Sequence, residues 1–352
     1  MARAPGMQDV ARLAGVSHQT VSRVLNDHPS VRAETRAKVQ AAIGSLGYRR
    51  NSAARALATN RSGTIGLLAT TSNLGGPVST LVAVAEASRA AGLYVSVVSL
   101  GLYDPASVHA ALDHFLDQGV EGIIAIAPVD AAVRAAASVA LDLPMVIMAP
   151  PLPTNRGVHV AVDQRQGARI AVRHLVEQGH RTIAHLAGPP EWLDAGERLA
   201  GWRSELESHG LDAPGPLAGD WTAASGYAAA TRLPDEVTAV FAANDLMALG
   251  LIRGLTECGR RVPEDVSVVG FDDIDAAGYV RPPLTTVRQD FGALGRAAVE
   301  LLLRRLAGED PPPATLIEPE LVVRASAASP GQSSDPGRST ISRAADGSAT
   351  TR

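Results

Sequence analysis

The chain has 352 residues, of which 46% are hydrophobic and 19% are charged, and its formal net charge at pH 7 is -4. This is the composition of an ordinary globular protein, and the length allows two or three compact cores. No run of about 18 apolar residues occurs, so we expect no membrane span.

The charge is distributed unevenly along the chain. Residues 1–62 hold ten Lys and Arg side chains and three acidic ones, Asp9, Asp27 and Glu34, which gives +7 and leaves -11 for the remainder. A compact basic segment joined to an acidic body is typical of a polyanion-binding module on a second domain.

The single cysteine indicates the compartment. Cys258 cannot form an internal disulfide, and this suits a reducing environment. The first residues also lack the apolar stretch and cleavage site of a secretory signal. We therefore expect a cytoplasmic protein.

Three short helices are predicted in the first fifty residues, over 9–14, 18–25 and 33–46. Ser17 is placed to cap the second helix, and Gly47 stops the third. Apolar residues recur on one face of each helix, so the three should pack around a small core.

From residue 63 onward, strand and helix patterns alternate. Strands are predicted at 65–70, 94–99, 122–127, 144–149, 182–187, 237–242 and 266–270. Helical patterns lie between them, including 78–91, 164–178, 195–209, 245–258 and 292–306. Such alternation predicts parallel sheets flanked by helices in two doubly wound lobes, with a ligand cleft at the carboxyl ends of the strands.

The predicted domains follow from these patterns. Residues 1–62 form an all-α DNA-binding domain and hinge, and residues 63–328 form a two-lobed α/β domain. The lobes are assigned to 63–162 plus 290–325 and to 163–289. Residues 329–352 are rich in small and polar residues and should be a disordered tail. With Ile341 as its one large apolar residue, this tail cannot form a coiled coil, so we expect a dimer and not a tetramer.

The stretch from Asp9 to Asn26 supplies a scaffold helix, a tight turn and a second helix, as a helix-turn-helix requires. The side chains of His18, Gln19 and Arg23 can pair with base edges. Short polar groups suited to phosphate oxygens come from Ser17, Thr20, Ser22 and Asn26. The alternative is that Ser17 only caps its helix and that His18 and Gln19 are solvated surface.

This stretch, DVARLAGVSHQTVSRVLN, closely resembles the lactose repressor family of helix-turn-helix regulators. The likeness continues through Gly47 and Tyr48 to residues 51–57. In that family the latter segment is a hinge helix in the minor groove, which implies DNA contacts by Asn51, Ala54 and Leu57. An apolar wedge such as Leu57 unstacks a base step and bends DNA. The alternative for Leu57 is a core position in a short linker helix.

The resemblance extends to about Ala325, through residues 198–202, 219–222, 244–250, 268–273 and 282–291. It implies a two-lobed domain like that of periplasmic binding proteins, with a small sugar in its cleft. By that match Arg198, Asn244 and Asp272 hold sugar hydroxyls and Trp221 stacks on the sugar. By the same match Gln289 and Phe291 line the cleft. The loop after the first strand differs from that of the family, but Thr70 can still offer a hydroxyl.

The residue types suit that chemistry, because a hydroxyl-rich ligand needs donors, acceptors and a flat apolar surface. Two alternatives stay open: Asn244 caps the next helix, or Asp272 pairs with a neighbouring basic side chain. One departure stands out, since Ala149 replaces an acidic residue that the resemblance leads us to expect near the end of the fourth strand.

These observations predict a sequence-specific transcription regulator, a repressor whose operator affinity is controlled by a small sugar such as a galactoside. One recognition helix per chain predicts a homodimer on near-palindromic double-stranded DNA. No cofactor, metal or catalytic residue is expected, because the chain has no phosphate-binding loop, zinc-protease motif or nucleophile elbow.

Two alternatives have the same fold. The effector could be another sugar or a nucleoside. It could act as a corepressor, or the protein could be an activator. More remotely, the chain could be a free sugar-binding protein, although the basic helix-turn-helix argues against that function.

Overall fold

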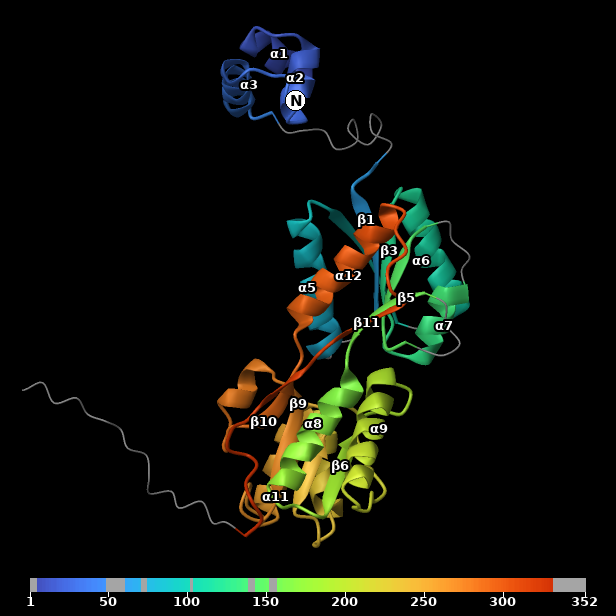
Figure 1. Ribbon diagram of the computed structural model, residues 1–352, viewed down its shortest axis with the longest axis vertical. Coiled ribbons are helices and arrows are strands. Elements are labelled where there is room, and N and C mark those ends of the chain that lie inside the picture. The colour runs from blue at the N-terminus through green and yellow to red at the C-terminus, as the bar shows by residue number, and fades with distance from the viewer. Residues whose placement is uncertain are drawn as a thin grey trace, which may run out of the picture. The chain divides into compact units, whose positions relative to one another are not determined.

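The structure is a computed structural model that describes residues 5–48, 61–70, 75–101, 104–138, 143–151 and 157–331. The chain divides into two compact units, Met1–Ser62 and Gly63–Arg352 (Figure 1). The predicted hinge residues Asn51, Ala54 and Leu57 lie outside the described residues, as does the predicted tail from residue 332 onward.

The first unit contains three helices, α1 (Met7–Ala14), α2 (His18–Leu25) and α3 (Ala33–Leu46). Gly15 and Gly47 end α1 and α3 with left-handed backbones, at φ 65° and 61°, which glycine adopts without the steric cost of a Cβ atom. Buried side chains from all three helices form one small core: Val10, Ala11, Val21, Val24, Val39 and Ala42. The three-helix prediction is confirmed, including both ends of α2.

The second unit begins with a lobe built on a six-stranded sheet of order β11-β5-β4-β3-β1-β2, and every pairing in it is parallel. Its strands are β1 (Thr64–Thr70), β2 (Tyr94–Leu100), β3 (Ile123–Ile126), β4 (Met145–Met148), β5 (Val158–Val162) and β11 (Ala314–Ile317). Its helices are α5 (Gly75–Ala90), α6 (Pro105–Asp117), α7 (Asp130–Ser138) and α12 (Phe291–Leu306), of which α5 packs against α12 (Figure 1). Strand β3 is buried along its whole length, because helices cover both faces of a parallel sheet.

The second lobe has a sheet of order β12-β10-β9-β8-β6-β7. Its strands are β6 (Ile183–Ala187), β7 (Leu217–Ala218), β8 (Ala239–Ala242), β9 (Ser267–Asp272), β10 (Thr285–Arg288) and β12 (Glu320–Val322). Its α-helices are α8 (Gln164–Glu177), α9 (Leu193–Ser208), α10 (Ala223–Ala229) and α11 (Asp245–Glu257), with 3-10 turns at Ala230–Arg232 and Asp275–Gly278. The edge strand β12 runs antiparallel to β10, unlike the all-parallel arrangement that the sequence pattern favours.

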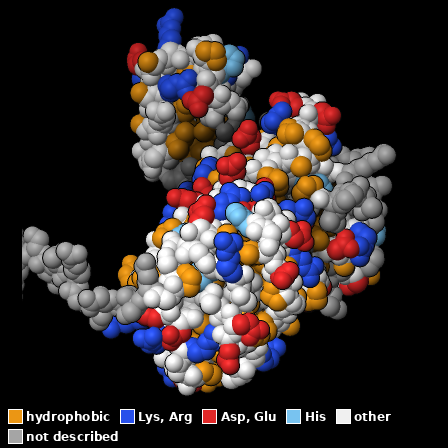
Figure 2. Space-filling view, turned by 60° about the horizontal axis from the view of Figure 1, so that its bottom comes forward, with side chains coloured by type: hydrophobic (Ala, Val, Ile, Leu, Met, Phe, Trp, Pro, Cys, Tyr) orange, Lys and Arg blue, Asp and Glu red, His pale blue; other side chains and the backbone are white. Residues whose placement is uncertain are grey.

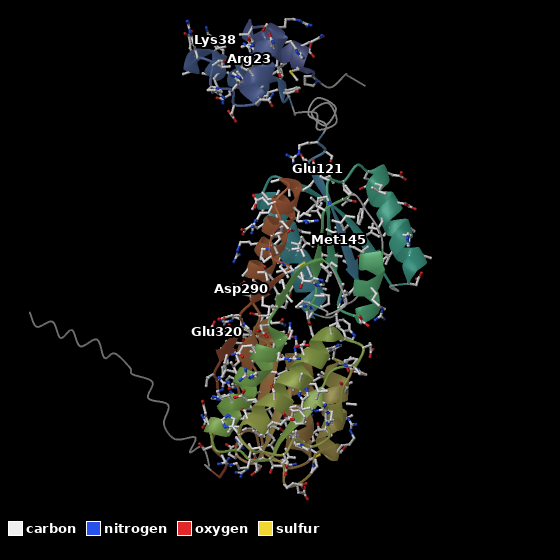
Figure 3. The ribbon with its side chains drawn as sticks, turned by 45° about the vertical axis from the view of Figure 1, so that its right-hand side comes forward. Arg23, Lys38, Glu121, Met145, Asp290 and Glu320 are labelled. Atoms are coloured by element: carbon white, nitrogen blue, oxygen red, sulfur yellow. The ribbon has the colours of Figure 1, made fainter. Side chains whose placement is uncertain are left out.

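The chain passes between the lobes three times, from β5 to α8, from β10 to α12 and from β11 to β12. Asp290 and Glu320, labelled in Figure 3, mark the second and third of these crossings. The third crossing differs from the predicted lobe boundary at residue 325, because β12 already pairs in the second sheet. A strand of three residues carries too little apolar pattern to be assigned to a sheet from sequence.

Charged side chains of both signs are interspersed over the face of the second unit seen in Figure 2. Among the described residues, no helix has the length and apolar character needed to cross a membrane.

Candidate functional site

Helix α2 and its two capping residues hold seven of the ten predicted DNA-binding residues. Five are exposed, and the side chains of Thr20 and Ser22 are half-buried; the exposed ones are Ser17, His18, Gln19, Arg23 and Asn26. Arg23 is labelled on this helix in Figure 3. Exposure on one short helix is what major-groove readout needs.

Ser17 also acts as the cap of α2. Its Oγ accepts a hydrogen bond from the backbone N–H of Thr20 at 3.1 Å and lies 2.9 Å from the Thr20 hydroxyl. This cap matters because an eight-residue helix is marginal without one. The hydroxyl still has a free lone pair or proton, so capping does not exclude a phosphate contact.

Six of the seven predicted effector-binding residues line a single cleft between the two lobes of the second unit: Arg198, Trp221, Asn244, Asp272, Gln289 and Phe291. The empty space there amounts to about 790 Å³, part of it open to solvent. Thr70 ends β1 half-buried, and it is not among the lining residues. Its Oγ1 is buried and has no hydrogen-bond partner among the described residues.

The topology explains this convergence. Asn244 follows β8, Asp272 ends β9, and Gln289 follows β10. These strands are parallel neighbours, so their carboxyl ends meet at one edge, where open α/β sheets bind ligands. Asn244 caps α11 through its Oδ1, which accepts from Met247 N at 2.9 Å. Its amide nitrogen donates to Trp221 O at 3.0 Å and has a second N–H to offer.

A buried chain of hydrogen bonds joins the polar side chains of the cleft. Arg198 Nε donates to Gln164 Oε1 at 2.9 Å, and Gln164 Nε2 donates to Gln289 Oε1 at 2.9 Å. Gln289 Nε2 then donates to Asp272 Oδ1 at 2.7 Å. Arg198 Nη2 lies 3.8 Å from the same oxygen. Asp272 therefore pairs with a basic side chain, as one alternative from the sequence proposed, and it also lines the cleft.

Aromatic rings form the walls around this chain. Trp221 is buried with a left-handed backbone at φ 72°. Its ring meets that of Trp192 edge to face at 5.8 Å. The Arg198 guanidinium lies 3.8 Å from the ring centre of Phe271 and 5.5 Å from that of Trp221, and these contacts hold the long side chain in place.

Burial changes the acidity of the carboxyl groups here. It raises the pKa of Asp272 to about 6, against the opposing effects of Arg198 and Gln289. It also raises the pKa of Asp194, which lines the same cleft. Behind them, burial and then the charge of Asp272 raise the pKa of Asp245 to about 8.

Three residues that the second lobe contributes to the cleft were not predicted from the sequence: Gln164, Trp192 and Asp194. The position of Asp194 could have been predicted, because it lies one helical turn before Arg198 and so shares its face of α9. Gln164 begins α8, directly after a crossing between the lobes, and only the tertiary structure reveals that position. Ala149 also lines the cleft.

Two buried histidines, one just before β6 and one within it, pack inside the second lobe. His185 is stacked between Trp202 and Phe241, and burial lowers its pKa to about 4. His180 contacts Thr238 at 2.9 Å and Ser267 at 3.1 Å. Within the part of the chain that the structure describes, no three His, Cys, Asp or Glu residues are grouped as a metal site.

Comparison with known proteins agrees with this architecture. Residues 6–51 match the family described as "Bacterial regulatory proteins, lacI family", and residues 172–327 match a periplasmic binding protein-like domain. The lactose operon repressor of Escherichia coli K12 is 38% identical over 312 residues, which cover 86% of this chain and 85% of that protein.

Solved structures are similar over nearly the whole chain. A lac repressor dimer bound to operator and the anti-inducer ONPF has a TM-score of 0.81 at 35% identity, and the match covers 93% of this chain and 100% of that one. A complex of the transcriptional regulator CelR with cellobiose has a TM-score of 0.68 at 34% identity, covering 92% and 99%. The predicted fold class is confirmed. The chain belongs to the lactose repressor family of bacterial regulatory proteins, and it is a DNA-binding regulator of transcription, not an enzyme.

Proposed function

We propose that this regulator is a cytoplasmic homodimer that represses transcription from a near-palindromic operator and responds to a small sugar, with a galactoside as the leading candidate. The observation that carries the sugar proposal is the hydrogen-bonded chain from Arg198 to Asp272 beside two tryptophans in one cleft. The similar repressor binds operator as a dimer, and the similar CelR binds cellobiose.

The cleft offers both hydrogen-bond donors and hydrogen-bond acceptors. Arg198 Nη2 and the second N–H of Asn244 are donors, and Asp272 Oδ2 is an acceptor that has no partner among the described residues. A sugar hydroxyl both donates and accepts, and Trp221 can cover the C–H face of its ring.

A ligand in this cleft changes operator affinity only by binding one arrangement of the lobes more tightly than another. Such coupling usually amounts to about 1–3 kcal/mol, and it is reciprocal between the two ligands. We expect the sugar to act as an inducer that favours the lobe arrangement with the lower affinity for DNA.

A gel-shift assay on the DNA upstream of the gene tests the proposal. The full-length protein should retard a near-palindromic fragment as a dimer, and a galactoside should release it. A panel of galactosides, glucosides and nucleosides identifies the effector. Release by nucleosides alone, or sugar binding that leaves operator affinity unchanged, would contradict the proposal.

The DNA-reading role of α2 has its own test. Replacing Gln19 with Ala should change which operator bases are preferred, because its amide can pair with a base edge at a cost of about 1–3 kcal/mol when lost. Thr20→Ala should instead weaken binding to all sequences alike. Selection of preferred sites from a random DNA pool measures both; an unaltered preference for Gln19→Ala would remove Gln19 from the base-reading set.

A further inference from the structure

The turn after β9 has an unusual backbone. Asp272 and Asp273 both have left-handed backbones, with φ 114° and 52°, although neither residue is a glycine. Residues with side chains hold such conformations only where the surrounding structure imposes them, and these conformations are concentrated at functional sites. Asp272 lines the effector cleft. The contacts that impose this turn therefore bear on the cleft.

Two arginines hold the carboxylate of Asp273. Arg288 Nε donates to its Oδ2 at 2.7 Å, and Arg324 Nη2 donates to its Oδ1 at 2.7 Å. The Asp273 side chain is 8% exposed, and the residue is not among those that line the cleft. Each carboxylate oxygen thus has its own charged donor, which makes a strong hydrogen bond. We call these three side chains the Asp273 clamp.

The two arginines of the clamp lie next to crossings between the lobes. Arg288 ends β10 and directly precedes Gln289, whose amide donates to Asp272. Arg324 follows β12, and its Nη1 donates to Leu284 O at 2.8 Å, which fixes the guanidinium. Two consecutive residues at the second crossing therefore hold two consecutive residues of the turn, the first through the clamp and the second through the cleft.

Helix α11 holds the end of the same turn. Asp245 Oδ2 accepts from Ile274 N at 2.9 Å, and its Oδ1 accepts from the Thr286 hydroxyl at 2.5 Å. Strand β9 leaves room for this carboxyl group, because a Cβ atom at Gly270 would lie 2.2 Å from Asp245 Oδ1. The turn is thus anchored just after Asp273, and the clamp is what holds the turn itself.

From these contacts we infer that Asp273 is a positioning residue for effector binding, which keeps the turn left-handed and so directs the Asp272 carboxylate into the cleft. The inference rests on the proposed sugar response, because it assigns a role behind the same site. Without the clamp, the backbone of Asp272 is free to relax and its carboxylate is free to leave Gln289. Fewer molecules would then be competent to bind, and the apparent affinity would fall by that fraction.

Calorimetry with methyl β-galactoside and the full-length protein tests this role. Asp273→Asn should weaken binding about tenfold or more, because asparagine tolerates a left-handed backbone as aspartate does and the change removes only the ionic part of the clamp. Asp275→Asn is the matched control and should leave the affinity unchanged. This aspartate is exposed in the same loop, and its side chain makes no hydrogen bond or ion pair among the described residues. Wild-type affinity in Asp273→Asn would overturn the inference.

Arg324→Gln tests the clamp from its other side. This change should cause a loss of affinity similar to that of Asp273→Asn. Because both changes remove the same contact, the double variant should lose clearly less than the sum of the two single losses. Additive losses would mean that the two residues act separately, which contradicts the clamp.

A second measurement needs no sugar. Burial raises the pKa of Asp272 to about 6, so between about pH 4 and pH 6 the folded protein binds a proton that the unfolded chain has lost. The ionised carboxylate therefore opposes folding above this range, and this penalty disappears as the pH falls. Asp272→Asn removes the penalty, so it should raise the free energy of unfolding in urea more at pH 7 than at pH 5.

The charged groups that face Asp272 are Arg198 and Asp194 of α9 and Asp245 of α11. In the Asp273→Asn background the difference between pH 7 and pH 5 should vanish, because a carboxylate released to solvent has its ordinary pKa. A difference that persists there would overturn the inference, even if the galactoside fails to bind. Failure of the galactoside to bind the wild-type protein, with the pH difference lost as expected, contradicts only the proposed effector.

Discussion

At the scale of single residues, Asp272 is the group through which pH should affect the proposed effector site. Burial raises the pKa of its carboxyl group to about 6, so acidification from pH 7 to pH 5 protonates it. A carboxylate accepts hydrogen bonds more strongly than a neutral acid. If only the ionised form binds, sugar affinity measured by calorimetry should fall about tenfold over that interval.

Asp194 provides the control, because burial also raises the pKa of its carboxyl group in the same cleft. Asp272→Asn should flatten the pH profile, and Asp194→Asn should leave most of the fall in place. The reverse result would assign the pH dependence to Asp194 instead.

At the scale of elements, the pair Gln164–Gln289 joins two of the three crossings between the lobes. Both side chains are buried, and each bonds a candidate ligand-binding residue, Arg198 or Asp272. Gln164→Leu would leave Arg198 Nε and Gln289 Oε1 unpaired. Each unpaired buried group costs about 1–3 kcal/mol, so the free energy of unfolding in urea should fall by about 2 kcal/mol or more.

The same change should reduce the effect of the sugar on operator affinity, because the link between cleft and crossing is lost. Gln166→Leu is the matched control in the first turn of α8, since no side-chain hydrogen bond of Gln166 occurs among the described residues. Equal effects of the two substitutions would mean that the pair is only part of the local packing.

At the scale of the whole molecule, the chain combines a basic DNA-binding unit with an acidic effector-binding unit, +7 on residues 1–62 and -11 on the remainder. Binding should weaken steeply with salt as phosphate contacts release counterions. Arg198→Ala, a change in the second unit, should leave the operator affinity and its salt slope unchanged and abolish the response to the sugar. A salt titration by fluorescence anisotropy, with and without the sugar, measures the operator affinity, its salt slope and the response to the sugar. Loss of operator binding in the variant would show that Arg198 supports the fold more than the response.

The sequence alone predicted the three helices of the first unit and the alternating strands of the second. Those features depend on local periodicity and capping, which neighbouring residues determine. Motif resemblance also led to six side chains that the structure brings to one cleft.

The tertiary structure decided the features that depend on distant segments. The strand β12 of three residues pairs with β10 in the second sheet, although nothing in its own residues selects that partner. Gln164 reaches the cleft only because the first crossing brings the start of α8 beside Gln289, 125 positions away in the chain. Such contacts are absent from any local pattern, because they join segments that lie far apart in the chain.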